Sequence, residues 1–166
     1  MATISSDKIS SGIIKMLPLG YNQSILATAA ASSVLGTADV YNMIKLSSDA
    51  SLTTGDGNST GGPTILGVTM GCDGIDAGTS LSMSAGDSGS STRYIATSTI
   101  GQSSTGGRVP STKTNSLGYQ PFATPTFATY TTPSLQTYLI QVKVVTSAAT
   151  ALAGNIRLLV DFTIDP

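Results

Sequence analysis

Two long runs near the carboxyl end of the chain alternate between apolar and other residues. They are SLQTYLIQVKVVT (134–146) and GNIRLLVDFTI (154–164), and both are rich in β-branched side chains. Successive side chains of a β-strand point to opposite faces of its sheet, so a period of two gives each strand one apolar face. The segment SAATALAGN (147–155) links the two runs. The pattern predicts two long strands that pair as an antiparallel hairpin.

Shorter strands are predicted upstream. In VYNMIKL (40–46), Val40, Ile44 and Leu46 fall on one face, and Asn42 is an exception to the period. The other runs of strand length have either a continuous apolar character or a period of two. These runs are 64–70, 79–85 and 92–100. In 24–35 the alanines could favour a helix, but the density of Ser and Thr and the absence of helical charges favour a strand.

Clusters of Gly, Asp, Asn and Pro separate these runs. Glycine permits positive φ, and Asp and Asn side chains bond their own backbone, so such clusters are typical of turns. We expect turns or loops at 52–63, 72–78 and 86–91, and a surface loop at 101–116. About seven or eight strands separated by turns predict an all-β fold, an antiparallel β-sandwich of jelly-roll type.

The amino-terminal segment differs from the rest of the chain. Residues 1–20 have no clean period, and Lys15 and Pro18 interrupt their apolar pieces, which makes the segment a poor signal peptide. We expect an extended arm that a partner or the domain body must order, followed by a single domain over 21–166. The prolines of 117–134 exclude a central strand there. The aromatic side chains of that segment are expected to cover a sheet edge or reach a neighbouring subunit.

Composition excludes several classes of protein. Only 10% of the 166 residues are charged, against about 25% in typical domains, so long exposed helices are not expected. The formal net charge is −1, and the Lys and Arg residues, including Arg108, are spread singly. This excludes a nucleic-acid surface and attraction to an anionic membrane. No apolar window approaches the ~18 residues of a membrane span.

Few charges and a mean hydropathy of +0.20 are unusual for a free monomer. One explanation is that much of the surface is buried in an assembly. The alternative is a monomer whose surface is solvated by serine and threonine.

The segment GDSGSS (86–91) contains Gly-Asp-Ser-Gly, the surround of the nucleophilic serine in trypsin-like proteases. A serine becomes nucleophilic when a base accepts its proton, usually a histidine held by a carboxylate. The chain has no histidine, so Ser88 cannot belong to a Ser-His-Asp triad. Lys45, Lys113 and Lys143 leave a Ser-Lys pair formally open, although their spacing does not support one. We predict a tight turn whose first glycine has positive φ and whose Asp and Ser bond their own backbone.

Residues for a metal or cofactor site are scarce. Zinc needs about four ligands, usually His and Cys, and the chain has no histidine and one cysteine, Cys72, which we interpret as a small buried hydrophobe. GDGN (55–58) faintly resembles a calcium loop, but the chain contains no Glu. We therefore expect no catalytic, metal or cofactor-binding residue and no cofactor. Four carboxylates could contribute to a paired-carboxylate site, and nothing selects two of them: Asp73, Asp76, Asp87 and Asp161.

One block of the chain has a familiar order. It consists of ADVYNMIKL (38–46), TILGVTMGCDGIDAGTSLSMSAGDSGSSTRYIATS (64–98), GYQPFATPT (118–126) and IRLLVDF (156–162). This order resembles a group of small proteins encoded beside the major capsid protein in tailed bacteriophages. The resemblance covers roughly residues 38–164 and consists of strands and turns without a catalytic signature. The family usually has a short Pro-Lys-Gly-Ala-like turn after the first strand, where this chain has a longer loop, an insertion that costs little.

The resemblance implies a virion structural protein, a capsid decoration, cement or head-fibre component. We expect it to bind the major capsid protein on the outer surface of the phage head, after synthesis in the bacterial cytoplasm. Capsid lattices offer threefold positions, so the expected self-association is a homotrimer. The expected contact surfaces are 1–20 and 117–134. The alternatives are a tail or head appendage that attaches to a host-surface glycan, which the lack of Trp disfavours, and a particle-bound enzyme, which the lack of His and Glu disfavours.

Overall fold

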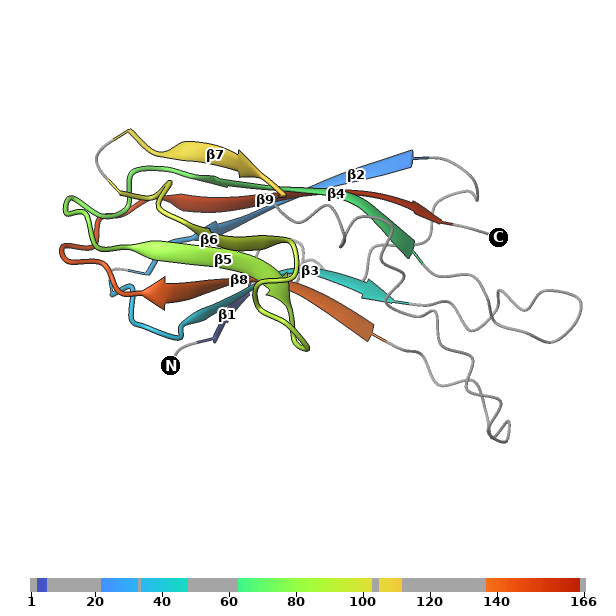
Figure 1. Cartoon of the computed structure of the whole chain (residues 1–166), viewed down its shortest axis with the longest axis horizontal. Coiled ribbons are helices and arrows are strands. Elements are labelled where there is room, and N and C mark those ends of the chain that lie inside the picture. Colours follow the sequence, from blue (N-terminus) through green and yellow to red (C-terminus); the bar gives the residue numbers. More distant parts are fainter. Residues whose placement is uncertain are drawn as a thin grey trace, which may run out of the picture.

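The computed structural model describes residues 3–5, 22–32, 34–47, 63–102, 105–111 and 137–164 (Figure 1). All regular secondary structure within these residues is β-strand. The strands are β1 (Thr3–Ser5), β2 (Asn22–Ala30), β3 (Val40–Ser47), β4 (Pro63–Cys72), β5 (Ser82–Asp87), β6 (Ile95–Ser98), β7 (Gly107–Pro110), β8 (Thr137–Thr146) and β9 (Asn155–Ile164).

The strands form two sheets that pack face to face (Figure 1). One sheet has the order β1-β3-β8-β5-β6 and the other has the order β2-β9-β4-β7. Strand β1 pairs in parallel with β3, and the other pairs are antiparallel. From β2 to β9, the chain changes sheets at every connection except the one from β5 to β6. This is the topology of a jelly roll, so the predicted all-β sandwich is confirmed.

Strands β8 and β9 do not form the predicted hairpin. Strand β8 lies between β3 and β5 in one sheet, and β9 lies between β2 and β4 in the other. Each strand has a full apolar face, and the two faces are buried when the strands lie in opposite layers of a sandwich. Both predicted strands are present, but their apolar faces pack across the core instead of side by side in one sheet.

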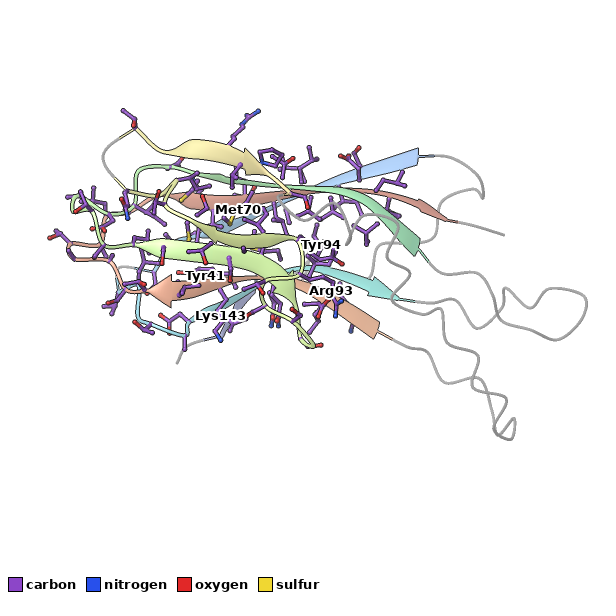
Figure 2. The ribbon with its side chains drawn as sticks, in the orientation of Figure 1. Tyr41, Met70, Arg93, Tyr94 and Lys143 are labelled. Atoms are coloured by element: carbon purple, nitrogen blue, oxygen red, sulfur yellow. The ribbon has the colours of Figure 1, made fainter. Side chains whose placement is uncertain are left out.

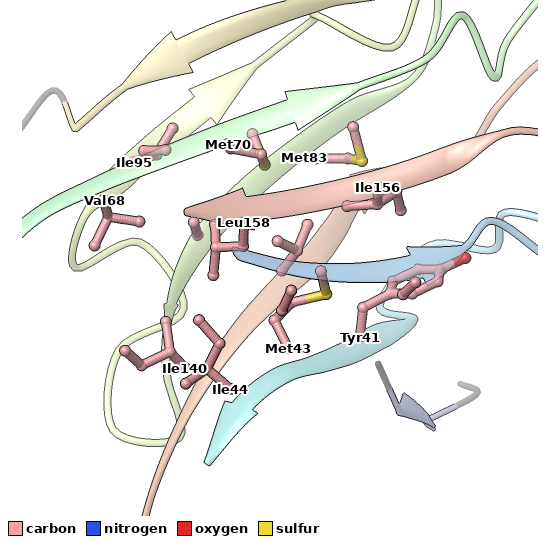
Figure 3. Packing of buried hydrophobic residues seen from close by; sticks show 14 of the residues in the cluster. Tyr41, Met43, Ile44, Val68, Met70, Met83, Ile95, Ile140, Ile156 and Leu158 are labelled. Carbon is pink, nitrogen blue, oxygen red and sulfur yellow. The ribbon is translucent and has the colours of Figure 1, made fainter. Parts of the chain in front are cut away.

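The core lies between the sheets (Figure 3). On β8 the core contains every second residue from Ile140 to Val144. On β9 it contains every second residue from Ile156 to Phe162. These are the alternating residues that the sequence predicts. Full burial of each large aliphatic side chain contributes about 1.5–3 kcal/mol.

A bulge changes the phase of β3. The register between β3 and β8 shifts between Asn42 and Ile44, so Met43 and Ile44 are both buried although they are neighbours in sequence. Tyr41 is also buried, whereas Val40 is partly exposed. The predicted face was therefore wrong at Val40, because a bulge inserts an extra residue and reverses the alternation beyond it. The side chain of Leu46 lies outside the described residues.

The predicted loop at 101–116 contains a strand. Residues 107–110 form β7, which pairs with the end of β4 and forms an edge of its sheet. Its proline is compatible with an edge position. Most of the arm 1–20, most of the long loop 52–63 and all of the segment 117–134 lie outside the described residues.

Candidate interaction surface

The GDSG segment is a turn organised by Asp87 at the end of β5. The carboxylate of Asp87 is buried and accepts hydrogen bonds from the backbone N–H groups of Gly89 (2.8 Å) and Ser90 (2.7 Å). It also forms an ion pair with the guanidinium of Arg93. Ser88 is exposed, and among the described residues no hydrogen bond joins it to a lysine. The aspartate therefore bonds its own backbone as predicted, and no activating contact to Ser88 is present in this part of the chain.

Gly86 is required for a reason that the sequence does not reveal. Among the described glycines, positive φ occurs at Gly106 and not at Gly86, so the conformation expected for the first glycine of the turn was wrong. A Cβ atom at Gly86 would lie 2.0 Å from the backbone oxygen of Ser90. Gly86 is the last but one residue of β5, and the returning chain passes directly over it. Close backbone approach is a common reason for glycine in a strand.

Asp76 joins two loops at one end of the sandwich. Burial alone would raise its pKa, but hydrogen bonds from backbone N–H groups outweigh burial and lower the pKa to about 2. The carboxylate is fully buried. It connects the β4–β5 loop with the β8–β9 loop by accepting from the backbone N–H groups of Gly78, Ser80, Leu81 and Thr150 at distances of 2.9, 3.3, 3.0 and 3.0 Å.

The other two candidate carboxylates also have structural partners. Asp73 accepts from Arg157 (Nη1 to Oδ1, 2.7 Å) and from the backbone N–H of Asn155 (2.9 Å), and these hydrogen bonds, led by that of Arg157, lower its pKa. Asp161 accepts from the hydroxyl of Ser24. No group of three or more metal-ligating side chains occurs in the described ranges. Each of the four carboxylates therefore stabilises a different loop or strand contact, and they do not form a common site.

Cys72 is buried at the end of β4, in agreement with its interpretation as a small hydrophobe. Burial raises the pKa of its thiol to about 12. At neutral pH it is therefore protonated, and it lacks the thiolate character of reactive cysteines.

The outer face of the β2-β9-β4-β7 sheet carries a shallow groove of about 430 Å³. One cross-strand row of its floor is largely apolar, because Leu26 pairs with Leu159 and Leu159 pairs with Thr69. Leu26 is 50% exposed. We call this feature the outer groove, and its lining residues are Leu26, Thr69, Gly71, Cys72, Gly107, Arg108, Arg157 and Leu159.

The neighbouring row of the outer groove is cationic. Gly71 on β4 pairs with Arg157 on one side and with Arg108 on the other. Arg157 is compensated by its ion pair with Asp73. Arg108 is exposed and has no ion-pair partner among the described residues. The groove thus combines an apolar half with one uncompensated positive charge.

The outer face of the other sheet is different in character. Figure 2 shows Tyr41 and Met70 between the sheets and Lys143 directed away from them. On this face Gln141 donates to Asn42 (2.7 Å). This face also exposes Val145 at 38%, so its outward positions are mixed in character.

Sequence reasoning did not find the outer groove. One signal for it is present in GNIRLLVDFTI, where Leu159 is an apolar residue on the strand face that otherwise carries Arg157, Asp161 and Thr163. The groove itself depends on the pairing of β2, β9, β4 and β7, which brings together residues from distant parts of the sequence.

Among the described residues, no helix is long and apolar enough to cross a membrane. No protein-family model matches the chain, and a search of curated proteins found no match. Two solved structures are similar in fold. A chain in the cyanophage Pam1 capsid asymmetric unit has a TM-score of 0.65 at 22% identity, over 95% of this chain and 96% of that one.

A chain in the capsid of Ralstonia phage GP4 has a TM-score of 0.66 at 17% identity, over 98% of this chain and 97% of that one. This fold occurs in bacteriophage capsids. Because both alignments cover almost the full length of each chain, the likeness concerns the whole jelly roll and not a shared fragment.

Proposed function

We propose that this protein is a structural component of a bacteriophage virion, which binds the assembled capsid shell and stabilises or decorates it. The observation that carries this proposal is the likeness, over nearly the whole of both chains, to chains of two bacteriophage capsid structures. The resemblance of residues 38–164 to proteins encoded beside the major capsid protein supports it independently of the fold.

The chemistry of the described residues is consistent with a structural role. The four carboxylates hold loops and strands, Ser88 has no base, and Cys72 is protonated and buried. The chain as a whole has no histidine and no glutamate. Binding energy, and not turnover, is therefore the means by which we infer that this protein acts.

The expected mechanism is stabilisation by mass action. A protein that binds the assembled shell, and not its dissociated subunits, shifts the equilibrium towards the shell. At a free concentration 100 times Kd, each occupied site contributes about 2.7 kcal/mol. We propose the major capsid protein as the partner, the outer surface of the head as the location, and a homotrimer as the bound form because capsid lattices offer threefold positions.

Co-sedimentation tests this proposal. Shells of the major capsid protein from the phage that encodes this chain, prepared without the chain, are mixed with the purified protein and sedimented. We expect saturable binding to shells, no binding to dissociated capsid subunits, and a higher melting temperature of the occupied shells. Absence of binding to shells, together with a signal on an array of bacterial surface glycans, would favour the host-attachment alternative.

A further inference from the structure

Gly71 lies within β4 at a position where the fold does not require glycine. Its φ is not in the positive region, since Gly106 is the described glycine with positive φ. A Cβ atom at Gly71 would meet Arg108 Cγ at 3.7 Å, Arg157 Cβ at 3.8 Å and the Gly107 carbonyl oxygen at 3.8 Å, which are ordinary contacts. Glycine in a strand is otherwise unfavourable, and it often marks a site where another chain approaches closely. Gly71 itself is buried between its neighbours and lines the outer groove, so its missing side chain leaves a hollow in the floor of that groove.

The hollow at Gly71 lies between two arginines of different status. Arg157 is held by Asp73 through two guanidinium nitrogens, at 2.7 and 3.4 Å. Arg108 has no such partner in the described part of the chain and is exposed on the edge strand β7. An acidic group placed over Gly71 would meet Arg108 and would find the charge of Arg157 already compensated.

The apolar row lies two residues away from the cationic row along the same strands. Leu159 lies two positions after Arg157 on β9, a distance of about 6.4–6.8 Å along a strand. Leu26 lies beside Leu159 on the edge strand β2. An extended peptide has the same repeat, so its residues i and i+2 match the cationic row and the apolar row.

We propose that the outer groove receives an extended, acidic segment of the major capsid protein. A carboxylate of this segment pairs with Arg108 over Gly71, and an apolar side chain two residues away packs against Leu26 and Leu159. This inference rests on the proposed function, and it identifies the face of the jelly roll that contacts the shell. The occupant is a protein segment and not nucleic acid, because a single uncompensated arginine beside exposed leucines does not make a phosphate-binding surface.

Three variants of the full chain test the groove by co-sedimentation with shells. Gly71→Val fills the hollow with a residue that favours strands, and Arg108→Glu reverses the exposed charge. Lys143→Glu is the matched control, since it makes the same charge change on the outer face of the opposite sheet. We expect the Kd for shells to rise at least tenfold for the two groove variants and less than twofold for the control. Thermal melts verify that each variant is folded, and Arg108→Glu covers the case in which Gly71→Val is not, because Arg108 is exposed at an edge.

The outcomes separate this inference from the proposed function. If the unaltered chain does not bind shells, both are overturned. If it binds and both groove variants bind equally well, the groove inference alone is overturned. The other possible occupant of the groove is a second copy of this chain, and sedimentation of the free variants tests for it. If both groove variants lose oligomeric mass and Lys143→Glu does not, the groove serves self-association and the inference is overturned.

Discussion

Asp76 provides the most demanding test of how this jelly roll is held together. Substitution by asparagine preserves the shape of the side chain but replaces one carboxylate oxygen by an NH₂ group. One oxygen of Asp76 accepts from Gly78 and Thr150, and the other accepts from Ser80 and Leu81. In either orientation of the asparagine side chain in Asp76→Asn, the NH₂ group faces two backbone N–H groups. It can only donate, so both of these N–H groups lose their acceptor.

The expected cost follows from this geometry. Hydrogen bonds to a charged group are worth about 1.5–3 kcal/mol each, so the loss of two predicts a decrease of roughly 3–6 kcal/mol in the free energy of unfolding. The site is fully buried, so water cannot replace the lost acceptor. Urea denaturation of both proteins at pH 7 measures the difference.

The pH dependence gives a second reading of the same site. The pKa of Asp76 is about 2 in the folded protein against an ordinary value of 3.8, because the backbone N–H groups favour the charged form. A depressed folded pKa means that this contribution is complete above about pH 4 and is lost as the pH falls towards 2. It amounts to about 2 kcal/mol, and we expect the wild-type protein to lose this much more stability than Asp76→Asn over that interval.

The control is Asp161→Asn, at a carboxylate that accepts from Ser24 at an exposed site. Its expected effect is below about 1 kcal/mol. The reasoning is refuted if Asp76→Asn costs no more than this control at pH 7, or if the wild-type protein and Asp76→Asn lose stability in parallel between pH 4 and pH 2.

Three further predictions concern the turn, a buried hydroxyl and the arm. Gly86→Ala should lower the free energy of unfolding by about 3 kcal/mol or more in urea denaturation, because its Cβ would lie 2.0 Å from the Ser90 oxygen. Ser88→Ala should change this free energy by less than about 0.5 kcal/mol. Equal effects of the two variants would contradict the close-approach explanation. Ser84→Ala should be neutral or stabilising by about 1 kcal/mol, since the buried Ser84 hydroxyl has no hydrogen-bond partner among the described residues, and a loss above 1 kcal/mol would contradict this. Deletion of residues 2–16 should abolish shell binding in co-sedimentation if the arm is the anchor, and undiminished occupancy would exclude that role.

The buried aspartates of this chain have a structural role. The motif around Ser88 and the clustered aspartates raise questions of catalysis and metal binding, and the lack of His and Glu in the chain argues against both. The folded chain adds that Asp76 and Asp87 are buried and bond backbone N–H groups. The role of Asp87 in holding its loop could be predicted, because its partners are close in sequence. The role of Asp76 could not, because its partner Thr150 is 74 residues away.

The pattern of apolar and polar residues was sufficient to predict most of the strands and most of their buried faces, although not β1 or β7. The period of two in β8 and β9 requires only the geometry of a single strand, so Ile140, Val142, Ile156 and Leu158 could be placed in a core without knowing the partner strands. The absence of histidine also excluded a Ser-His-Asp triad at Ser88 within this chain, because such a triad needs its histidine wherever the chain folds.

The pairing of the strands became known from the folded chain. Local periodicity contains no information on whether β8 and β9 lie in one sheet or face each other across the core, since both arrangements bury the same residues. The bulge in β3 and the outer groove at Gly71 depend on strands that are distant in sequence. The steric need at Gly86 is local, because it comes from the path of the backbone at Ser90. The bulge and the groove arise from contacts between segments, and therefore they become visible when the sheets are assembled.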